Sequence, residues 1–352
     1  MKFGAVPIQR SLGAIVAHGR AVKGLVLKKG EIVRPHHILA LEELGIDSLV
    51  VAEPEAGDVG ENAAALALAR AIAGDNLVVE PPGTGRVNIF AERNGIFIVD
   101  PTLIDRVNAV DERITLATLA PMRNIARGEM AATIKIIPFA VPETALTDAV
   151  DAASGAKLSV APFRPLRLGV ISTLLPGLKM SVVTKTSRLL AERVATTGAT
   201  IVADERVVHD VPMLAGAIGT VAAASDIIII FGASAISDRR DVIPAAIEQS
   251  GGDIVHFGMP VDPGNLLLIA QLADGTPVLG APGCARSPKE SGFDWVLQRM
   301  LAGISVSSAD IRRMGAGGLL IDDAQRMRSE TRRVRRTSFS QPNLIGISGD
   351  QA

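Results

Sequence analysis

One segment places small and charged residues directly after the most hydrophobic run of the chain. It reads SDIIIIFGASAISDRRDVIP over residues 225–244. Three small residues follow the predicted strand: Gly232, Ala233 and Ser234. Their backbone N–H groups can line an anion-binding concavity, and the guanidinium group of Arg240 can bind phosphate. The alternative is a tight strand-to-helix turn with solvated charges, in which Asp241 only caps the next helix.

Three other segments put polar or small residues after predicted strands. The first is STLLPGLKMS, the second is VVHDVP with Asp210, and the third is APGCARSP. Each has a structural alternative as a helix cap or a plain connection, but four such loops at one sheet edge favour a binding site. The candidate ligand-binding residues in the first and third segments are Ser172, Thr173, Pro282, Gly283, Arg286 and Ser287.

The composition restricts the class of protein. The 352 residues are 48% hydrophobic and 21% charged, and the net charge is −1. This balance does not indicate nucleic-acid or membrane binding, and aromatic residues, at 3%, are too few for a base-stacking surface. A single cysteine excludes an internal disulfide, so we expect a cytoplasmic location. The N-terminal segment shows no signal-peptide pattern.

Strands and helices alternate regularly from residue 166 to residue 304. This pattern predicts an α/β domain with a doubly wound, mostly parallel sheet, in which the polar segments lie at the carboxyl ends of the strands. A turn at residues 273–275 predicts an antiparallel hairpin, formed by residues 266–272 and 276–280, at one edge of the sheet.

The first 160 residues predict a mixed α+β region. Residues 60–74 are rich in alanine and leucine and predict a helix. Residues 85–100 predict a hairpin with its turn at Asn94-Gly95, and Asp100 is expected to cap a helix that begins at Pro101. Two prolines in residues 161–165 indicate a linker. Residues 305–352 are expected to be helical at first and then a flexible, arginine-rich tail.

These motifs resemble the molybdopterin-binding fold of molybdopterin adenylyltransferases and molybdopterin molybdotransferases. The similar segments are RRDVIP after IIIIFGASA, VVHDVP and VLGAPGCARSP. KKGEIVRPHHILALEELGIDSLVVAE also resembles a molybdotransferase segment. The sequence departs from the family in three respects. The glycine-rich loop is Gly232-Ala233-Ser234-Ala235, Leu174-Leu175-Pro176 replaces an acidic segment, and the last 48 residues leave no room for the C-terminal barrel of molybdotransferases.

The resemblance implies a protein of molybdenum-cofactor biosynthesis that binds molybdopterin or its adenylylated form. It implies a transferase in which Asp241 holds Mg²⁺ or positions the reacting phosphate and Asp210 assists, with molybdate or a nucleotide as co-substrate. It also implies a homodimer that works with molybdoenzyme maturation partners. Two alternatives stay open: a non-catalytic cofactor carrier for a separate nucleotidyltransferase, and a relative of the pyridine-nucleotide recycling proteins.

Overall fold

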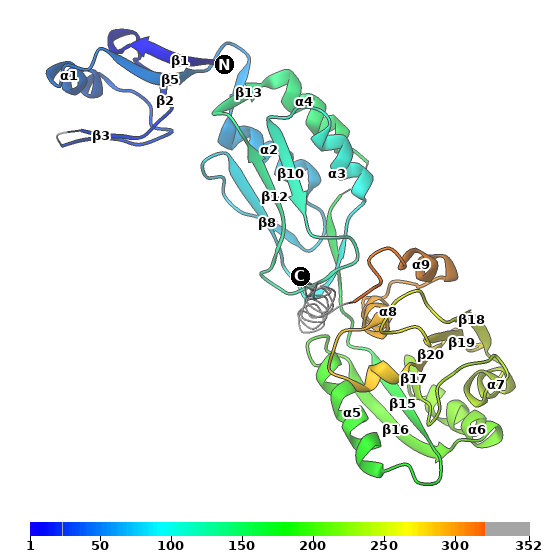
Figure 1. The fold of residues 1–352 in the computed structure, drawn as a ribbon. Coiled ribbons are helices and arrows are strands. Elements are labelled where there is room, and N and C mark those ends of the chain that lie inside the picture. The colour runs from blue at the N-terminus through cyan, green and yellow to red at the C-terminus, as the bar shows by residue number, and fades with distance from the viewer. Residues whose placement is uncertain (23, 156, 321–352) are drawn as a thin grey trace, which may run out of the picture. The chain divides into compact units, whose positions relative to one another are not determined.

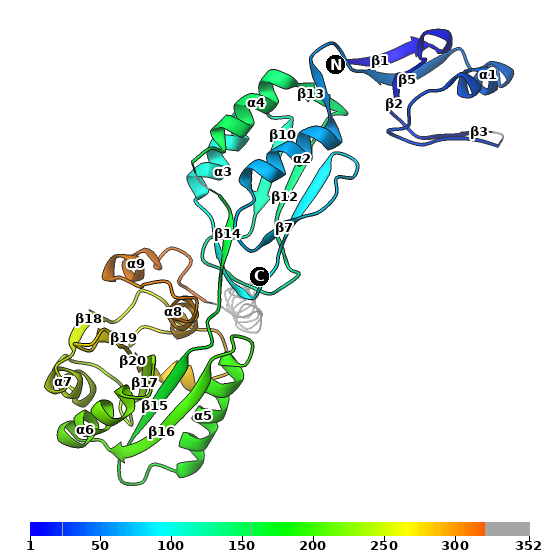
Figure 2. The same ribbon diagram turned by 180° about the vertical axis from the view of Figure 1, so that it is seen from behind.

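The computed structural model describes residues 1–22, 24–155 and 157–320, and the chain forms two compact units (Figures 1 and 2). Unit 1 consists of Met1–Pro165, Val194–Ala199 and Gln298–Ser305. Unit 2 consists of Leu166–Arg193, Thr200–Leu297 and, among the described residues, 306–320. The described helices include none with the length and apolar character that crossing a membrane requires.

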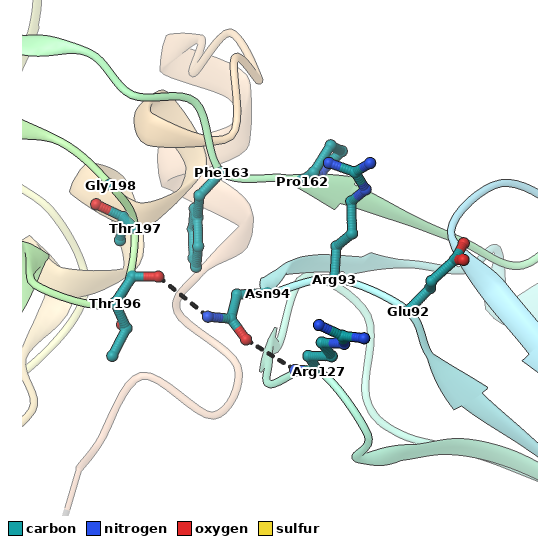
Figure 3. A pocket seen from close by; sticks show the side chains of 9 residues that line it. All are labelled: Glu92, Arg93, Asn94, Arg127, Pro162, Phe163, Thr196, Thr197 and Gly198. Carbon is teal, nitrogen blue, oxygen red and sulfur yellow. Dashed lines mark hydrogen bonds between the residues drawn. The ribbon is translucent and has the colours of Figure 1, made fainter.

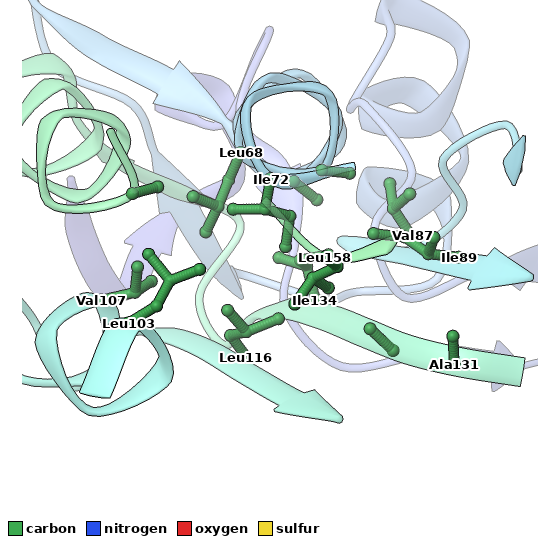
Figure 4. Close-up of a cluster of buried hydrophobic side chains, with 14 of the residues drawn as sticks. Leu68, Ile72, Val87, Ile89, Leu103, Val107, Leu116, Ala131, Ile134 and Leu158 are labelled. Carbon is green, nitrogen blue, oxygen red and sulfur yellow. The ribbon is translucent and has the colours of Figure 1, made fainter. Parts of the chain in front are cut away.

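The main core of unit 1 lies between an antiparallel sheet and helices. The sheet has the order β10 (Ile114–Thr118), β12 (Met130–Ile136), β8 (Arg86–Ala91) and β7 (Leu77–Val79). The helices that contribute to this core are α2 (Glu61–Ile72), α3 (Pro101–Asn108) and α4 (Glu143–Ala152). Leu68 and Ile72 of α2 meet Ile134 of β12 in this cluster (Figure 4). The predicted helix over residues 60–74 is therefore confirmed, because its apolar residues face a sheet.

The predicted hairpin over residues 85–100 is wrong. Strand β9 (Gly95–Ile98) does not pair with β8 but with β14 (Ser159–Pro162) and β11 (Asn124–Ile125). A Cβ at Gly95 would collide with the backbone of Ala161 in β14. Glycine is needed at this position for the close approach of a strand that lies far along the chain. Because of this pairing, Ala161 and Pro162, the first two residues of the expected linker, belong to strand β14.

The predicted cap of α3 is confirmed, since Asp100 Oδ1 accepts a hydrogen bond from the Thr102 N–H at 2.9 Å.

The other elements of unit 1 form smaller sheets and a short helix. They are β1 (Lys2–Pro7), β5 (Ser48–Glu53), β2 (Ile15–Val16), β3 (Arg20–Val22), β4 (Leu25–Leu27), α1 (Pro35–Glu43), β6 (Asp58–Gly60) and β13 (Ala140–Pro142).

Unit 2 contains a six-stranded, mostly parallel sheet, as the alternating pattern predicts. Its order is β16 (Thr200–Val208), β15 (Arg167–Leu174), β17 (Ile227–Phe231), β20 (Pro277–Ala281), β19 (Leu268–Gln271) and β18 (Asp253–Phe257). Strands β16, β15, β17 and β20 are parallel to one another, and β19 is antiparallel to both of its neighbours. The hairpin of β19 and β20 exists, but it is not at the edge of the sheet, because β18 pairs with the outer side of β19.

Helices that lie wholly or mainly in unit 2 connect and cover these strands. They are α5 (Met180–Val194), α6 (Val211–Ala222), α7 (Val242–Gln249), α8 (Gly292–Leu301) and α9 (Ser308–Arg313), with a 3-10 turn, η2, at Gly283–Arg286. Buried residues of α6 and α7 pack on isoleucines of β15 and β17, including Ile171, Ile228 and Ile230. The continuous apolar run of β17 is explained by its central place in the sheet. Helix α9 lies in the expected tail, and residues 321–352 lie outside the described residues.

Candidate functional site

The strand order of unit 2 brings the predicted segments to one edge of the sheet. From β15 the chain passes through α5 to β16 on one side, and then through α6 to β17 on the other side of β15. Such a reversal creates a crevice beyond the carboxyl ends of the strands, where ligands bind in open α/β sheets. The four predicted segments follow the carboxyl ends of β15, β16, β17 and β20, so they surround this point.

Ser172 and Thr173 are buried near the end of β15, and their side chains point to opposite faces of the sheet. Ser172 is 3% exposed and its hydroxyl has no hydrogen-bond partner in the described chain. Thr173 is fully partnered: its Oγ1 accepts the Ala233 N–H at 2.7 Å and lies 2.8 Å from His209 Nδ1. The unpartnered hydroxyl of Ser172 is notable because buried polar groups are normally satisfied by protein, water or ligand.

The small-residue loop after β17 has a tight turn and free donors. A Cβ at Gly232 would lie 2.6 Å from the Ser234 carbonyl oxygen, so this position requires glycine. Ser234 and Ala235 are exposed, and within residues 157–320 their backbone N–H groups make no hydrogen bond. These donors are available to an anion.

Arg286, in η2, carries a positive charge that no carboxylate of the described residues neutralises. Its Nη2 donates to the Gly232 carbonyl oxygen at 2.7 Å, and its guanidinium carbon lies 5.9 Å from the centre of the Phe231 ring. Arg286 forms no ion pair with the described residues, and its burial lowers the pKa of the guanidinium. A partly buried cation without a counterion is unfavourable by itself and favours a bound anion.

Ser172 and Arg286 both lie next to Phe231. In the parallel ladder Ser172 is opposite Phe231, so their side chains share a face of the sheet. Arg286 lies over the ring of the same phenylalanine, which also packs against Phe293 of α8 at a ring separation of 6.4 Å. An unpartnered hydroxyl and an unneutralised cation therefore flank one aromatic ring at the crevice.

Arg193, at the end of α5, holds the loop after β20 in place. Its Nε donates to Asp294 Oδ1 at 2.7 Å, its Nη1 donates to the Ala285 carbonyl at 2.6 Å, and its Nη2 donates to the Ser287 carbonyl. Sequence reasoning missed this residue, because it lies in a helix about 90 positions before the loop that it binds. Pro282 is buried beside this network, while Gly283 is exposed with open space around it.

The two candidate catalytic aspartates differ in their hydrogen bonds. Asp241 accepts the Val242 N–H at 2.9 Å through Oδ1 and the Ser237 N–H at 3.3 Å through Oδ2. Asp210 precedes α6, but its carboxylate makes no capping bond. No group of three or more metal-binding side chains occurs among the described residues. Asp210 is therefore the aspartate whose carboxylate is available to a ligand, whereas Asp241 already holds its own loop.

Arg240 lies at the surface and pairs with Asp238. Its Nε donates to Asp238 Oδ1 at 2.8 Å, and the Arg240 side chain is 91% exposed. This pairing raises the pKa of Arg240 and lowers the pKa of Asp238. The phosphate contact predicted for Arg240 stays a prediction, and the structure gives this side chain another partner.

A pocket of about 520 Å³ occurs within unit 1, and none of the predicted site residues lines it (Figure 3). Asn94 lies at its centre: its Nδ2 donates to the Thr196 carbonyl at 3.1 Å, and its Oδ1 accepts the Arg127 N–H at 2.8 Å. Four separate segments line it, so no local motif could reveal it. Its charged side chains, on Glu92, Arg93 and Arg127, are all exposed, and we assign it no ligand.

No protein-family model matches this chain, and no curated protein matches it. Among solved structures it is similar to the molybdopterin biosynthesis MoeA protein of Pyrococcus horikosii. The identity is 16% and the TM-score 0.30, over 86% of this chain and 75% of that protein. It is also similar to the molybdopterin biosynthesis enzyme MoaB of Thermus thermophilus, with 16% identity and a TM-score of 0.29, over 39% of this chain and 97% of that one.

A CinA protein of unknown function from Thermoplasma acidophilum is similar as well. It shares 16% identity and a TM-score of 0.25 over 35% of this chain and 90% of that protein. Similarities at this level do not decide the fold or the ligand. The function is therefore argued from the residues at the crevice of unit 2.

Proposed function

We propose that unit 2 binds a phosphorylated pterin of molybdenum-cofactor biosynthesis, namely molybdopterin or its adenylylated form. The observation that carries the proposal is the unneutralised, partly buried guanidinium of Arg286, which shares the Phe231 ring with the unpartnered hydroxyl of Ser172. A phosphate group would neutralise the cation and accept from the hydroxyl. A pterin is proposed because the segments IIIIFGASA with RRDVIP, VVHDVP and VLGAPGCARSP resemble the molybdopterin-binding fold.

The phosphate end of the ligand is assigned to the loop after β17 and to η2. The N–H groups of Ser234 and Ala235 and the guanidinium of Arg286 would bind its oxygens, with Ser172 beneath them. Gly232 permits the tight turn that presents these donors. Arg193 keeps η2 in position and is not assigned to the ligand, because each of its three nitrogens already donates to Asp294 or to a carbonyl of the loop after β20.

Transfer chemistry at this site would depend on Asp210. Mg²⁺ binds one or two carboxylates together with substrate phosphates, and when bound it neutralises charge that develops on the phosphates. Asp210 fits this role, since its carboxylate makes no bond to the helix that it precedes. Both oxygens of Asp241 already accept backbone N–H groups, which favours a supporting role.

A second candidate function is that of a non-catalytic cofactor carrier. It is favoured by the fixed Asp241 and by the non-acidic segment Leu174-Leu175-Pro176.

The proposal is tested by identifying the ligand of the native protein. The full chain, purified from a molybdopterin-producing host, is analysed by native mass spectrometry, and the bound material is oxidised to fluorescent pterins. We expect one phosphorylated pterin per site, and we expect Arg286→Met to lose it. Arg188→Met is the matched control, because Arg188 is an exposed arginine of α5 that pairs with Glu192.

Three outcomes would contradict or redirect the proposal. Recovery of no pterin, together with added molybdopterin binding no better than free nucleotides, rejects it. Recovery of a pyridine nucleotide supports the recycling alternative. If the pterin binds but neither ATP, CTP nor molybdate is turned over in the presence of Mg²⁺, the carrier function is supported. Homodimerisation and delivery to maturation partners stay predictions from the resemblance.

A further inference from the structure

His209 follows β16 directly. Hydrogen bonds through Thr173 connect it to the end of β15 and to the loop after β17. Its Nδ1 lies 2.8 Å from Thr173 Oγ1, at the end of β15. The same oxygen accepts the Ala233 N–H, in the loop after β17, at 2.7 Å. Thr173 is 1% exposed, whereas His209 is only partly buried. The three strand ends at the reversal of the sheet are thus linked through one hydroxyl group.

This arrangement determines where the imidazole carries its proton. The Ala233 N–H can only donate, so it occupies one acceptor position of Thr173 Oγ1. The hydroxyl hydrogen of Thr173 then needs an acceptor, and the only one that residues 1–320 provide, within their described parts, is His209 Nδ1. If Nδ1 carried the proton instead, the buried hydroxyl hydrogen would have no acceptor, which is unfavourable. Nδ1 is therefore the acceptor, and the neutral ring carries its hydrogen on Nε2.

The Nε2–H group is free to donate to a ligand. Within the described parts of the chain, the ring makes no hydrogen bond other than the one to Thr173. The next residue, Asp210, has a carboxylate with no bond to α6. The end of β16 thus offers one fixed N–H donor and, at the adjacent position, one free carboxylate acceptor.

We propose that His209 donates a hydrogen bond from Nε2 to the heteroaromatic ring of the ligand and that Thr173 is the residue that positions it. The inference rests on the proposed function and names the part of the ligand that meets β16. In the absence of Mg²⁺, a phosphate is disfavoured beside Asp210, because like charges repel. A neutral lactam edge, with a carbonyl oxygen beside an N–H, matches a donor followed by an acceptor. The pyrimidinone edge of a pterin has this pattern.

The tautomer can be measured without any ligand. Two-bond ¹H–¹⁵N correlation spectra of the full chain distinguish a protonated from an unprotonated Nδ1. We expect an unprotonated Nδ1 in the wild type and in Thr173→Ser, which keeps the hydroxyl. We expect a mixture of both tautomers in Thr173→Val, which removes it. A protonated Nδ1 in the neutral wild-type ring, or a tautomer unchanged in Thr173→Val, overturns the inference.

Binding separates the ring contact from the phosphate contact. The probes are 6-hydroxymethylpterin, which has the lactam edge and no phosphate, and inorganic pyrophosphate. His209→Asn keeps an acceptor for Thr173 but is too short to place an N–H where Nε2 lies. A single neutral hydrogen bond corresponds to a loss of about two- to tenfold in affinity. We expect this loss for the pterin, with unchanged pyrophosphate affinity, and a reversed pattern for Arg286→Met.

The two proposals fail in different ways. If neither pterin nor molybdopterin binds the wild type, the proposed function and the assignment of the ring edge both fail, while the tautomer is still read from the spectra. If molybdopterin binds the wild type and His209→Asn equally well, only the role of His209 is overturned. A loss of pyrophosphate affinity in His209→Asn also overturns it, because the ring would then meet the phosphate.

Discussion

Replacing Arg286 with methionine tests the proposed phosphate site most directly. Methionine keeps an unbranched, partly buried side chain over the Phe231 ring and removes the charge and the donors. In the ligand-free protein two effects oppose each other. The Gly232 carbonyl loses its 2.7 Å hydrogen bond, and an unneutralised cation is removed from a partly buried place. We therefore expect the free energy of unfolding to change by about 1 kcal/mol or less without ligand.

The effect on binding should be much larger. A hydrogen bond to a charged group contributes about 1.5–3 kcal/mol, which corresponds to roughly 10- to 150-fold in the dissociation constant. At a ligand concentration 100 times the wild-type constant, the ligand stabilises the wild type by about 2.7 kcal/mol. A 30-fold weaker variant would gain only about 0.9 kcal/mol at the same concentration. Arginine stays protonated and a phosphate monoester is doubly ionised above about pH 7, so this difference should not vary between about pH 7 and pH 9.

The assay is denaturant unfolding of the wild type, Arg286→Met and Arg188→Met, each with and without molybdopterin. Arg188→Met removes the same charge from an exposed position on α5, so it should behave as wild type in both conditions. The reasoning is refuted if Arg286→Met retains the full stabilisation by ligand. It is also refuted if the ligand-free variant is destabilised by several kcal/mol, because Arg286 would then be a structural residue.

Three further predictions concern the surface arginine, the aspartates and a histidine. Arg240→Ala should leave the melting temperature unchanged and weaken phosphate binding by less than about fivefold, because its exposed charge is screened by water. Asp210→Asn should lower any Mg²⁺-dependent turnover by about 10²- to 10³-fold. Asp241→Asn should mainly lower the melting temperature, because Asp241 holds its own loop. The opposite result would make Asp241 the main carboxylate. Burial lowers the pKa of His256 below 6.5, so the unfolded chain binds a proton more readily and the free energy of unfolding should fall as the pH drops below 6.5. His256→Gln should reduce this pH dependence of the free energy of unfolding in denaturant titrations from pH 8 to pH 5. It should not abolish the dependence, because burial also lowers the pKa of His37. An unchanged pH dependence in His256→Gln would contradict the assignment.

The elements of unit 2 could be predicted because their sequence patterns are local. The apolar run of β17 and the alanine-rich pattern of α6 identify a buried strand and a helix without any tertiary information.

The hairpin expected around Asn94-Gly95 does not form, because this dipeptide can serve two different purposes. Gly95 suits a tight turn, but here it permits the close approach of β14. Only the distant partner decides between these uses.

The network around Arg193 could not be predicted for a related reason. A basic residue in the last turn of a helix is common, because it interacts favourably with the helix dipole. Nothing in its neighbourhood indicates that it binds Asp294 and two carbonyls of the loop after β20. The unneutralised state of Arg286 is equally invisible in the sequence, since it depends on which carboxylates the fold keeps away.

The two aspartates show why similar local sequences can give different sites. Both follow a parallel strand and precede a helix, so the sequence suggests equivalent caps. Ten residues, 232–241, connect β17 to α7, whereas only His209 and Asp210 connect β16 to α6. A longer loop has backbone N–H groups of its own to satisfy, and Asp241 accepts one of them from Ser237. In the short connection, the N–H groups of His209 and Asp210 already donate to the carbonyls of Leu174 and Val208, so the Asp210 carboxylate remains available at the crevice. The length of the connection therefore favours Asp210 over Asp241 as the carboxylate that meets the ligand.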